Sequence, residues 1–237
     1  LGRISRLMGG VRQETNAIAP ALPTLCARAR ARLDGASLTA TSKDELRAAI
    51  DRAVLDLDRV TSIFEALLRI AQLEAGARRA AFTVLDIGPL LEGLTELYEA
   101  SMEEAGLTLD LKLGQIGPVN GDPHLLQQAV ANLLDNAIKF APANSTITLS
   151  AAMQNGSVAI SVADQGPGME EQDMMRASER FFRAEAARNT PGAGLGLSLV
   201  QAVVHLHGGT MELANGHPGL RVMLHLPVAQ KKSTLPA

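Results

Sequence analysis

The chain has 237 residues, of which 46% are hydrophobic, 20% are charged and only 3% are aromatic, and its formal net charge is −3. This is enough apolar material for two modest domains with cores of their own. The scarcity of aromatic side chains argues against a nucleic-acid surface built on base stacking, and the small net charge argues against a polyanionic partner.

The distribution of charge and the cysteine content bear on the domain organisation and on the redox compartment. Residues 1–80 carry 13 Lys/Arg and 9 Asp/Glu, a net of +4, whereas the remainder carries 9 and 16, a net of −7. This asymmetry fits two domains that dock and separate, and it equally fits ordinary solvated faces. Cys26 is the one cysteine, which excludes an intrachain disulfide and suits a reducing compartment.

Targeting and membrane signals are not visible in the sequence. No apolar run reaches the roughly 18 residues that a membrane helix needs, and nothing resembles a signal peptide. The sequence begins at Leu1 rather than Met, so we expect a fragment of a longer protein.

The first predicted domain, residues 1–76, is a helical hairpin. One helix is expected from Gly2 to Leu33, ended by Asp34-Gly35-Ala36-Ser37. Ser42-Lys43-Asp44-Glu45 has the form of a capping box and predicts the start of a second helix. That helix carries residues spaced alternately by four and three, which is a heptad seam: Ile50, Val54, Leu57, Thr61, Phe64, Leu68 and Ala71.

A two-helix hairpin with one apolar seam cannot bury that seam by itself. Two copies can bury it as a four-helix bundle, so we expect a homodimer through residues 1–75. The alternative is a hairpin that packs against the second domain of its own chain.

Residues 77–228 are predicted to form an α+β sandwich, with a disordered tail over 229–237. Helices are expected from Asp86 to about Ala105, from Asp122-Pro123 to about Phe140, and over Gly194–Leu206. Strands are expected over Phe82–Leu85, Leu107–Leu113, Ser145–Met153, Val158–Ala163, Met211–Ala214 and Leu220–Leu226. Between the helices and strands, Gln165–Ala193 is rich in Gly, Met and charged residues.

Three segments of the second domain carry residues suited to binding a nucleotide. In Asn132–Phe140, Asn132 and Asn136 share one helix face, and Lys139 lies on the same side. Amide oxygens are hard ligands for Mg²⁺, and Lys is a point charge for phosphate. Taken alone, the pair of asparagines also fits an ordinary polar helix face.

The second segment is Asp164-Gln165-Gly166-Pro167-Gly168, directly after a predicted strand. Its glycines would let the backbone approach a flat ligand, and Asp164 could accept a hydrogen bond from an exocyclic amine; an ordinary turn is the alternative. The third segment, Gly192–Leu197, opens a helix, where glycine N–H groups form an anion site. Its spacing matches neither a Walker loop nor a dinucleotide fold.

Together and in this order, the three segments resemble the N, G1 and G2 boxes of the histidine kinase ATP-binding domain, which has the Bergerat-type fold of the gyrase, Hsp90 and MutL superfamily. Glu179–Arg183 resembles the family's F box, and the hairpin resembles its dimerisation and phosphotransfer domain. The resemblance implies Mg²⁺ on Asn136, phosphate contacts from Asn132 and Lys139, and adenine recognition by Asp164. It also implies a mobile lid over Gln165–Ala193. The implied ATP-binding residues are Asn132, Asn136, Lys139, Asp164, Gly166, Gly168, Phe182, Arg183, Gly192, Gly194, Leu195, Gly196 and Leu197.

The sequence departs from this family at the phospho-accepting residue. The family's first helix carries a His followed by an acidic residue, but the matching stretch Asn16–Leu25 has Pro20 and Ala21 at these positions. Proline has no nucleophilic atom and alanine cannot accept a proton. Thr24 matches the family's phosphatase-assisting position, and a helix-surface hydroxyl is its alternative reading.

The five histidines, His124, His205, His207, His217 and His225, all lie outside the hairpin. His205 and His207 come at a predicted helix end, where they are expected to help cap it. Pro20 and Pro23 predict a bend or break near Ala19–Thr24, because proline inside a helix removes a hydrogen bond and costs about 3 kcal/mol.

The sequence therefore predicts a two-component signalling core that binds Mg-ATP but does not phosphorylate itself at the usual site, either a degenerate or an engineered kinase. It would act by ATP-linked docking of its domains or by binding a response regulator. A phosphotransferase acting in trans on a partner's histidine is the second hypothesis, and an ATP-driven clamp is the third. The resemblance further implies the cytoplasmic portion of a bacterial inner-membrane sensor, with membrane contact only through segments outside this chain.

Overall fold

The computed structural model describes residues 27, 30–31, 33–38, 42–74, 82–187, 190, 192–216 and 218–229. The predicted bend near Ala19–Thr24 and most of the predicted first helix lie outside the described residues, as does the predicted tail beyond Ala229. The chain divides into two units, Leu1–Leu68 and Arg69–Ala237. No helix in the described ranges combines the length and the apolar character that crossing a membrane requires.

The first unit contains most of the described part of the predicted helical hairpin. Residues 33–38 are helical, so the predicted break over residues 34–37 is wrong. One Gly lowers helix stability by about 1 kcal/mol and one Asp by at most about 0.7 kcal/mol, so neither forbids helical backbone, and Asp34 forms an i,i+4 ion pair with Arg30 at 3.6 Å. Helix α2 spans Lys43–Glu74. The Ser42 Oγ accepts a hydrogen bond from the Glu45 N–H at 3.2 Å, which confirms the predicted N-terminal cap.

The seam predicted on α2 is exposed in the single chain. Ile50, Val54, Leu57 and Leu68 are each between 45% and 49% exposed. The hydroxyl of Thr61, the polar member of the seam, donates to the Leu57 carbonyl at 3.1 Å and is therefore satisfied within its own helix. Large apolar side chains exposed along one helix are typical of an interaction surface.

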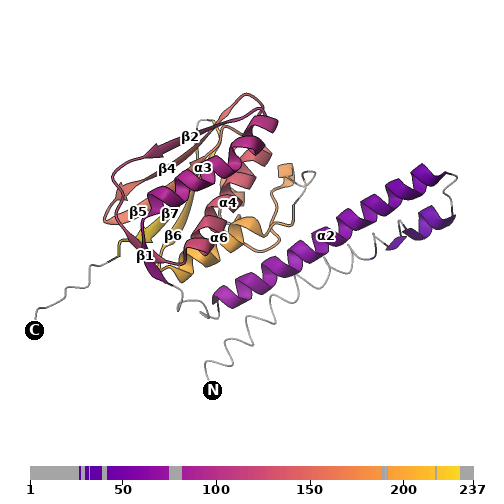
Figure 1. Cartoon of the computed structure of the whole chain (residues 1–237), viewed down its shortest axis with the longest axis horizontal. Helices are drawn as coiled ribbons and strands as arrows, with labels where there is room; N and C mark the ends of the chain where they lie inside the picture. The colour runs from indigo at the N-terminus through magenta and orange to yellow at the C-terminus, as the bar shows by residue number, and fades with distance from the viewer. Residues whose placement is uncertain are drawn as a thin grey trace, which may run out of the picture. The chain divides into compact units, whose positions relative to one another are not determined.

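The second unit is an α/β sandwich built on a five-stranded sheet with the order β2-β4-β5-β7-β6. Strands β2 and β4 run parallel, and the other neighbours run antiparallel. Helices α3, α4 and α6 cover one face of this sheet (Figure 1). The strands are β2 (Thr108–Leu113), β4 (Thr146–Gln154), β5 (Ser157–Ala163), β6 (Thr210–Asn215) and β7 (Leu220–Pro227), and the helices are α3 (Ile87–Glu104), α4 (Pro123–Phe140) and α6 (Gly196–Leu206).

These bounds agree with the sequence predictions to within two residues, and three short elements were not predicted. Strands β1 (Thr83–Leu85) and β3 (Val119–Gly121) form a separate antiparallel pair; β1 was predicted and β3 was not. A three-residue strand is too short to show an alternating pattern. The segment Gln165–Ala193 contains the short helices α5 (Glu171–Met174) and η2 (Glu185–Ala187). Ala229 donates its N–H to the Pro118 carbonyl at 2.7 Å.

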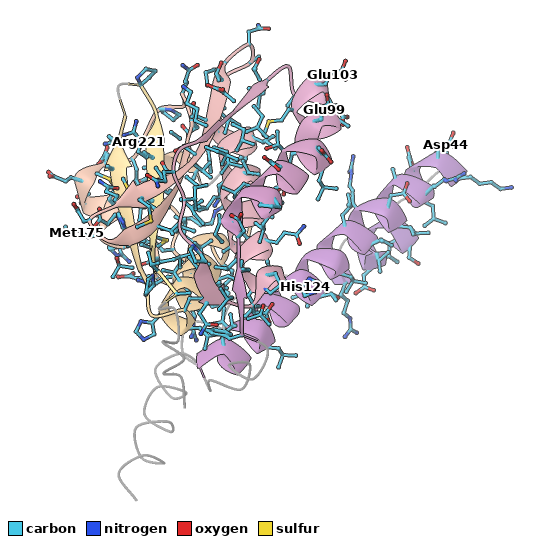
Figure 2. The ribbon with its side chains drawn as sticks, turned by 60° about the vertical axis from the view of Figure 1, so that its left-hand side comes forward. Asp44, Glu99, Glu103, His124, Met175 and Arg221 are labelled. Atoms are coloured by element: carbon cyan, nitrogen blue, oxygen red, sulfur yellow. The ribbon has the colours of Figure 1, made fainter. Side chains whose placement is uncertain are left out.

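The core lies between the helices and the sheet. Alternate residues of β4 are buried, among them Ile147 and Leu149, and most of β5 is buried, including Val158 and Ile160. The opposite side of α3 is exposed, and Figure 2 shows Glu99 and Glu103 projecting from it. Asp86 and Asp122 cap α3 and α4: Asp86 accepts from the Gly88 N–H, and Asp122 accepts from two N–H groups of the first turn of α4.

His207 ends α6 and ties this helix to two other elements. It is only 8% exposed, and its Nδ1 donates to the Val203 carbonyl at 2.7 Å, which confirms the predicted capping. Its Nε2 accepts from the Asp122 N–H at 3.1 Å, and its ring stacks on Phe82 with centroids 4.6 Å apart. Burial lowers the pKa of His207, against the opposing effects of the Val203 bond and the Asp122 charge. His205, in contrast, is exposed.

We expect acid to destabilise the fold through His207. Its folded pKa lies below the ordinary value, so between about pH 6.5 and that lower pKa the unfolded chain binds a proton that the folded chain does not. The free energy of unfolding should therefore fall with falling pH in this window, by up to about 1.4 kcal/mol per pH unit.

Urea unfolding at about pH 7.5 and about pH 5.5 measures this effect. His207→Gln should reduce the difference between the two pH values, and His205→Gln, the exposed control on the same helix, should leave it unchanged. An H207Q variant with the wild-type pH dependence would contradict the assignment.

Candidate functional site

Helix α4 buries one side in the core and carries a polar stripe beside that side. Its buried residues are Leu125, Leu126, Ala129, Val130, Leu133, Leu134 and Ala137. Asn132, Asn136 and Lys139 are half-buried beside this apolar face. The Asn132 Nδ2 donates to the Gln128 carbonyl at 2.9 Å, so its Oδ1 is turned away from its own helix.

The start of α6 lies directly against this stripe. A Cβ built on Gly196 would lie 3.3 Å from the Asn136 Nδ2 and 3.6 Å from the Asn132 Oδ1. A Cβ built on Gly192 would lie 2.8 Å from the Lys139 Nζ. The two glycines therefore lie where a side chain would crowd the amides and the ammonium. The structure thus brings the first and third predicted segments together.

The segment that resembles an F box supports the glycine segment from the other side. The Phe181 N–H donates to the Gly194 carbonyl at 2.9 Å, and a Cβ on Gly194 would lie 2.6 Å from the Phe182 carbonyl oxygen. Gly194 has a φ of +71° and Phe181 a φ of +64°. A positive φ is unusual for a bulky residue and costs on the order of 1–3 kcal/mol, so the surrounding packing must hold it.

Two cationic side chains meet beside this segment. Burial lowers the pKa of Lys139, and the positive charge of Arg183 lowers it further. The Arg183 Nη2 donates to the carbonyls of Ala187 and Thr190. A negatively charged group bound here would relieve the repulsion between the two cations, so the pair favours a phosphate-bearing ligand.

The second predicted segment adjoins the C-terminal end of α4. The Asp164 Oδ1 accepts from the Gly166 N–H at 2.8 Å and from the Leu220 N–H at 3.1 Å. A Cβ on Gly166 would lie 2.7 Å from the Phe140 carbonyl oxygen, so only glycine allows this approach. Because Oδ1 makes both bonds, the second carboxylate oxygen of Asp164 can serve a ligand.

The structure places the remaining predicted residues as follows. Phe182 is half-buried, and the Arg176 guanidinium lies over its ring at 4.6 Å from the centroid. Leu195 is buried and Leu197 is half-buried at the start of α6, while Gly168 has a φ of +74°. Pro20, Ala21 and Thr24 lie outside the described residues.

Two supporting features were not recognised in the sequence. Asn215 at the end of β6 and Leu220 at the start of β7 contact the second segment; the Asn-Gly pair at 215–216 signals a turn but not these contacts. The Tyr98 hydroxyl, on α3, donates to the Asp135 Oδ1 at 2.7 Å. Burial, this hydrogen bond and the Asp135 charge together raise the pKa of Tyr98, so the hydroxyl keeps its proton and remains a donor. Asp135 lies between the two asparagines in sequence.

Comparison with known proteins agrees with this geometry. Residues 121–230 match the family described as histidine kinase-, DNA gyrase B-, and HSP90-like ATPase. The chain contains a histidine-kinase-type ATP-binding core. It is 35% identical over 161 residues to the sensor protein CreC of Escherichia coli (strain K12), which covers 68% of this chain and 34% of CreC. The chain spans about a third of the length of the curated relatives that it matches first.

Two solved structures extend the comparison. Full-length ShkA in complex with AMPPNP is 26% identical, with a TM-score of 0.67, covering 96% of this chain and 47% of that chain. The histidine kinase AdeS of Acinetobacter baumannii has a TM-score of 0.71 at 21% identity, covering 88% of this chain and 98% of that chain, and so supports the fold alone. The histidine-kinase-type core thus rests on the family match and on the sequence relatives together.

The close approach of α6 to the α4 stripe predicts the behaviour of Gly196→Ala. The added methyl group would crowd the Asn136 amide at 3.3 Å and fill the space beside Asn132 at 3.6 Å, so we expect ATP affinity to fall about tenfold, which corresponds to about 1.4 kcal/mol. The melting temperature should change little, because Gly196 lies in a helix that tolerates alanine.

Gly93→Ala is the matched control, since Gly93 lies in α3 and a Cβ there meets nothing within 4 Å. Titration of each variant with ATP and a thermal melt provide the two measurements. Wild-type ATP affinity in G196A would show that the two amides do not contact the nucleotide.

Proposed function

We propose that this histidine-kinase-type core binds Mg-ATP at the α4 stripe and the two glycine segments, Asp164–Gly168 and Gly192–Leu197, and acts in two-component signalling. The observation that carries the proposal is the approach of Gly192 and Gly196 to Lys139, Asn132 and Asn136. The AMPPNP complex of ShkA supports an adenine nucleotide as the ligand, and the sensor-protein relatives support the signalling context.

The donor set suits each part of Mg-ATP. The Asn136 side-chain oxygen would supply one hard ligand to Mg²⁺, and Asn132 would contact the phosphates, whose oxygens complete such sites together with water. Bound there, Mg²⁺ would neutralise phosphate charge. Lys139 and Arg183 add positive charge on the protein side, and the N-terminus of the 11-residue helix α6 directs N–H groups toward an anion. Asp164 would accept the adenine amine through its second oxygen.

We further propose that the core does not phosphorylate itself at the usual position. Pro20 and Ala21 stand where the family has its phospho-accepting His and the acidic proton acceptor. Without a nucleophile, the nucleotide would act by changing how residues 1–76 and 77–228 dock, or by controlling the binding of a response regulator. The chain would then be the degenerate or engineered cytoplasmic part of a bacterial inner-membrane sensor.

A labelling experiment tests this proposal. The chain is incubated with γ-labelled ATP and Mg²⁺, and both nucleotide binding and acid-labile phosphate are measured. We expect binding without label on the chain, and we expect Asp164→Asn to lose most of the binding because it removes the carboxylate that would accept the adenine amine. Acid-labile label on the chain alone would refute the absence of self-phosphorylation. Failure of the wild type to bind ATP would refute the nucleotide site.

The presence of all three predicted nucleotide-binding segments supports a second function. Such a core could transfer phosphate in trans to a histidine of a partner protein, and label found only on an added partner would support this reading over the first. The third candidate, an ATP-driven clamp, is weaker. The gyrase and MutL members of the superfamily do not have a helical hairpin of this kind, so the predicted hairpin counts against it.

The exposed stripe on α2 supports a homodimer through residues 1–75 arranged as a four-helix bundle. In the single chain, Ile50, Val54 and Leu57 are all close to half exposed, and a second copy would cover them.

Light scattering at micromolar concentration should therefore give twice the chain mass of 25.0 kDa. Ile50→Lys combined with Leu57→Lys should give the monomer mass, because two charges per chain would be buried in the interface. Leu97→Lys, at a 66% exposed position on α3, is the control and should remain dimeric. A wild-type monomer would overturn this part of the proposal.

A further inference from the structure

Asn215, the last residue of β6 before the loop to β7, contacts the segment Asp164–Met169 with its side chain. The Asn215 Oδ1 accepts from the Met169 N–H at 2.9 Å, and the Asn215 Nδ2 donates to the Met169 carbonyl at 2.7 Å. One amide group thus pairs with both backbone polar groups of a single residue, as a neighbouring strand would. A Cβ on Gly168 would lie 2.7 Å from the same Oδ1, so Gly168 leaves room for this pairing.

The same loop holds the other end of the segment through its backbone. The Leu220 N–H donates to the Asp164 Oδ1 at 3.1 Å, and the Asp164 N–H donates to the Leu220 carbonyl at 3.0 Å. Gly219 has a φ of +96°, and a Cβ there would lie 1.8 Å from the Asp164 carbonyl oxygen. The loop is closed by a hydrogen bond from the Gly216 N–H to the Gly219 carbonyl at 2.7 Å. Arg221, labelled in Figure 2, marks where β7 continues from this loop.

We propose that Asn215 is a positioning residue for recognition of the nucleotide base, an inference that rests on the proposed ATP site. The segment Asp164–Met169 contains two glycines and would sample many conformations if only its Asp164 end were fixed. Asn215 fixes its Met169 end. The Asp164 carboxylate is then already oriented when the base arrives, and less ordering accompanies binding.

The chemistry of the side chain explains why an amide stands at this position. Asn carries a donor and an acceptor on one planar group and so can pair with an N–H and a carbonyl at once. Asp at position 215 would keep an acceptor for the Met169 N–H but would lose the donor to the Met169 carbonyl. Ala would lose both bonds.

The test compares ATP with inosine triphosphate, which has an oxygen in place of the adenine amine and the same triphosphate. The wild type should prefer ATP, because Asp164 accepts from the amine. In Asn215→Ala we expect ATP affinity to fall about tenfold and inosine triphosphate affinity to change less than about twofold, so that the preference collapses. Asn215→Asp should retain an intermediate preference.

Asn155→Ala is the matched control. Asn155 lies in the turn between β4 and β5, and the strand register places this turn at the opposite end of the sheet from the loop that holds Asn215. This variant should keep the wild-type preference for ATP even if its melting temperature falls, since its backbone has a φ of +50° that alanine tolerates poorly.

The outcomes distinguish failure of the positioning role of Asn215 from failure of the proposed ATP site. Equal losses for both nucleotides in N215A, or no loss for either, would overturn the positioning role while leaving the ATP site in place. A wild type that binds neither nucleotide would overturn the proposed function itself. A collapsed preference in N215A, with an intermediate value in N215D and an unchanged one in N155A, would support the inference.

Discussion

The burial of one face of α4 is the constraint on which the site depends. Seven apolar side chains of this helix lie in the core, and they fix its rotation about its own axis. Asn132, Asn136 and Lys139 must then project from the remaining side, toward the start of α6. Turning the helix to bury these groups would leave amides and an ammonium without partners, at a cost of about 2–7 kcal/mol for each uncharged polar group and more for a charge. The same packing that stabilises the domain therefore orients the groups that we propose bind the nucleotide.

Polar anchors at both ends of α4 strengthen this arrangement. At the N-terminal end, the Asp122 N–H donates to His207 of α6, and the Asp122 carboxylate caps α4 itself. Nearer the C-terminal end, Tyr98 of α3 donates to Asp135. The three helices on the sheet are thus linked by hydrogen bonds as well as by apolar contacts, and the second link, at Asp135, lies directly beside Asn136 in sequence. Burial keeps the pKa of His207 low and that of Tyr98 high, so both links keep one protonation state near neutral pH.

The site itself carries features that are unfavourable without a ligand. Lys139 and Arg183 repel each other, Phe181 has a positive φ, and two glycines leave the polar stripe uncovered. Each becomes easier to understand if an anion binds between the stripe and α6, because the anion offsets the repulsion and occupies the space that side chains would fill. Residues that break local rules in this way are expected at functional sites rather than in the core.

The sequence by itself determined what depends on neighbours in the chain. The caps at Ser42, Asp86 and Asp122, the periodicity of the helices, the longer strands, the polar stripe and the two glycine segments all follow from patterns within a few residues. The presence of Pro20 at the position where the resembled family carries its phospho-accepting histidine is likewise a matter of sequence alone. Only the tertiary structure decided the helical backbone over residues 34–37, the short strand β3, and the contacts of His207 with Asp122 and of Asn215 with Met169. The partners in these two contacts are 85 and 46 residues apart. Such contacts leave no periodic signal, because they depend on how the sheet and helices bring distant loops together rather than on local conformational preference.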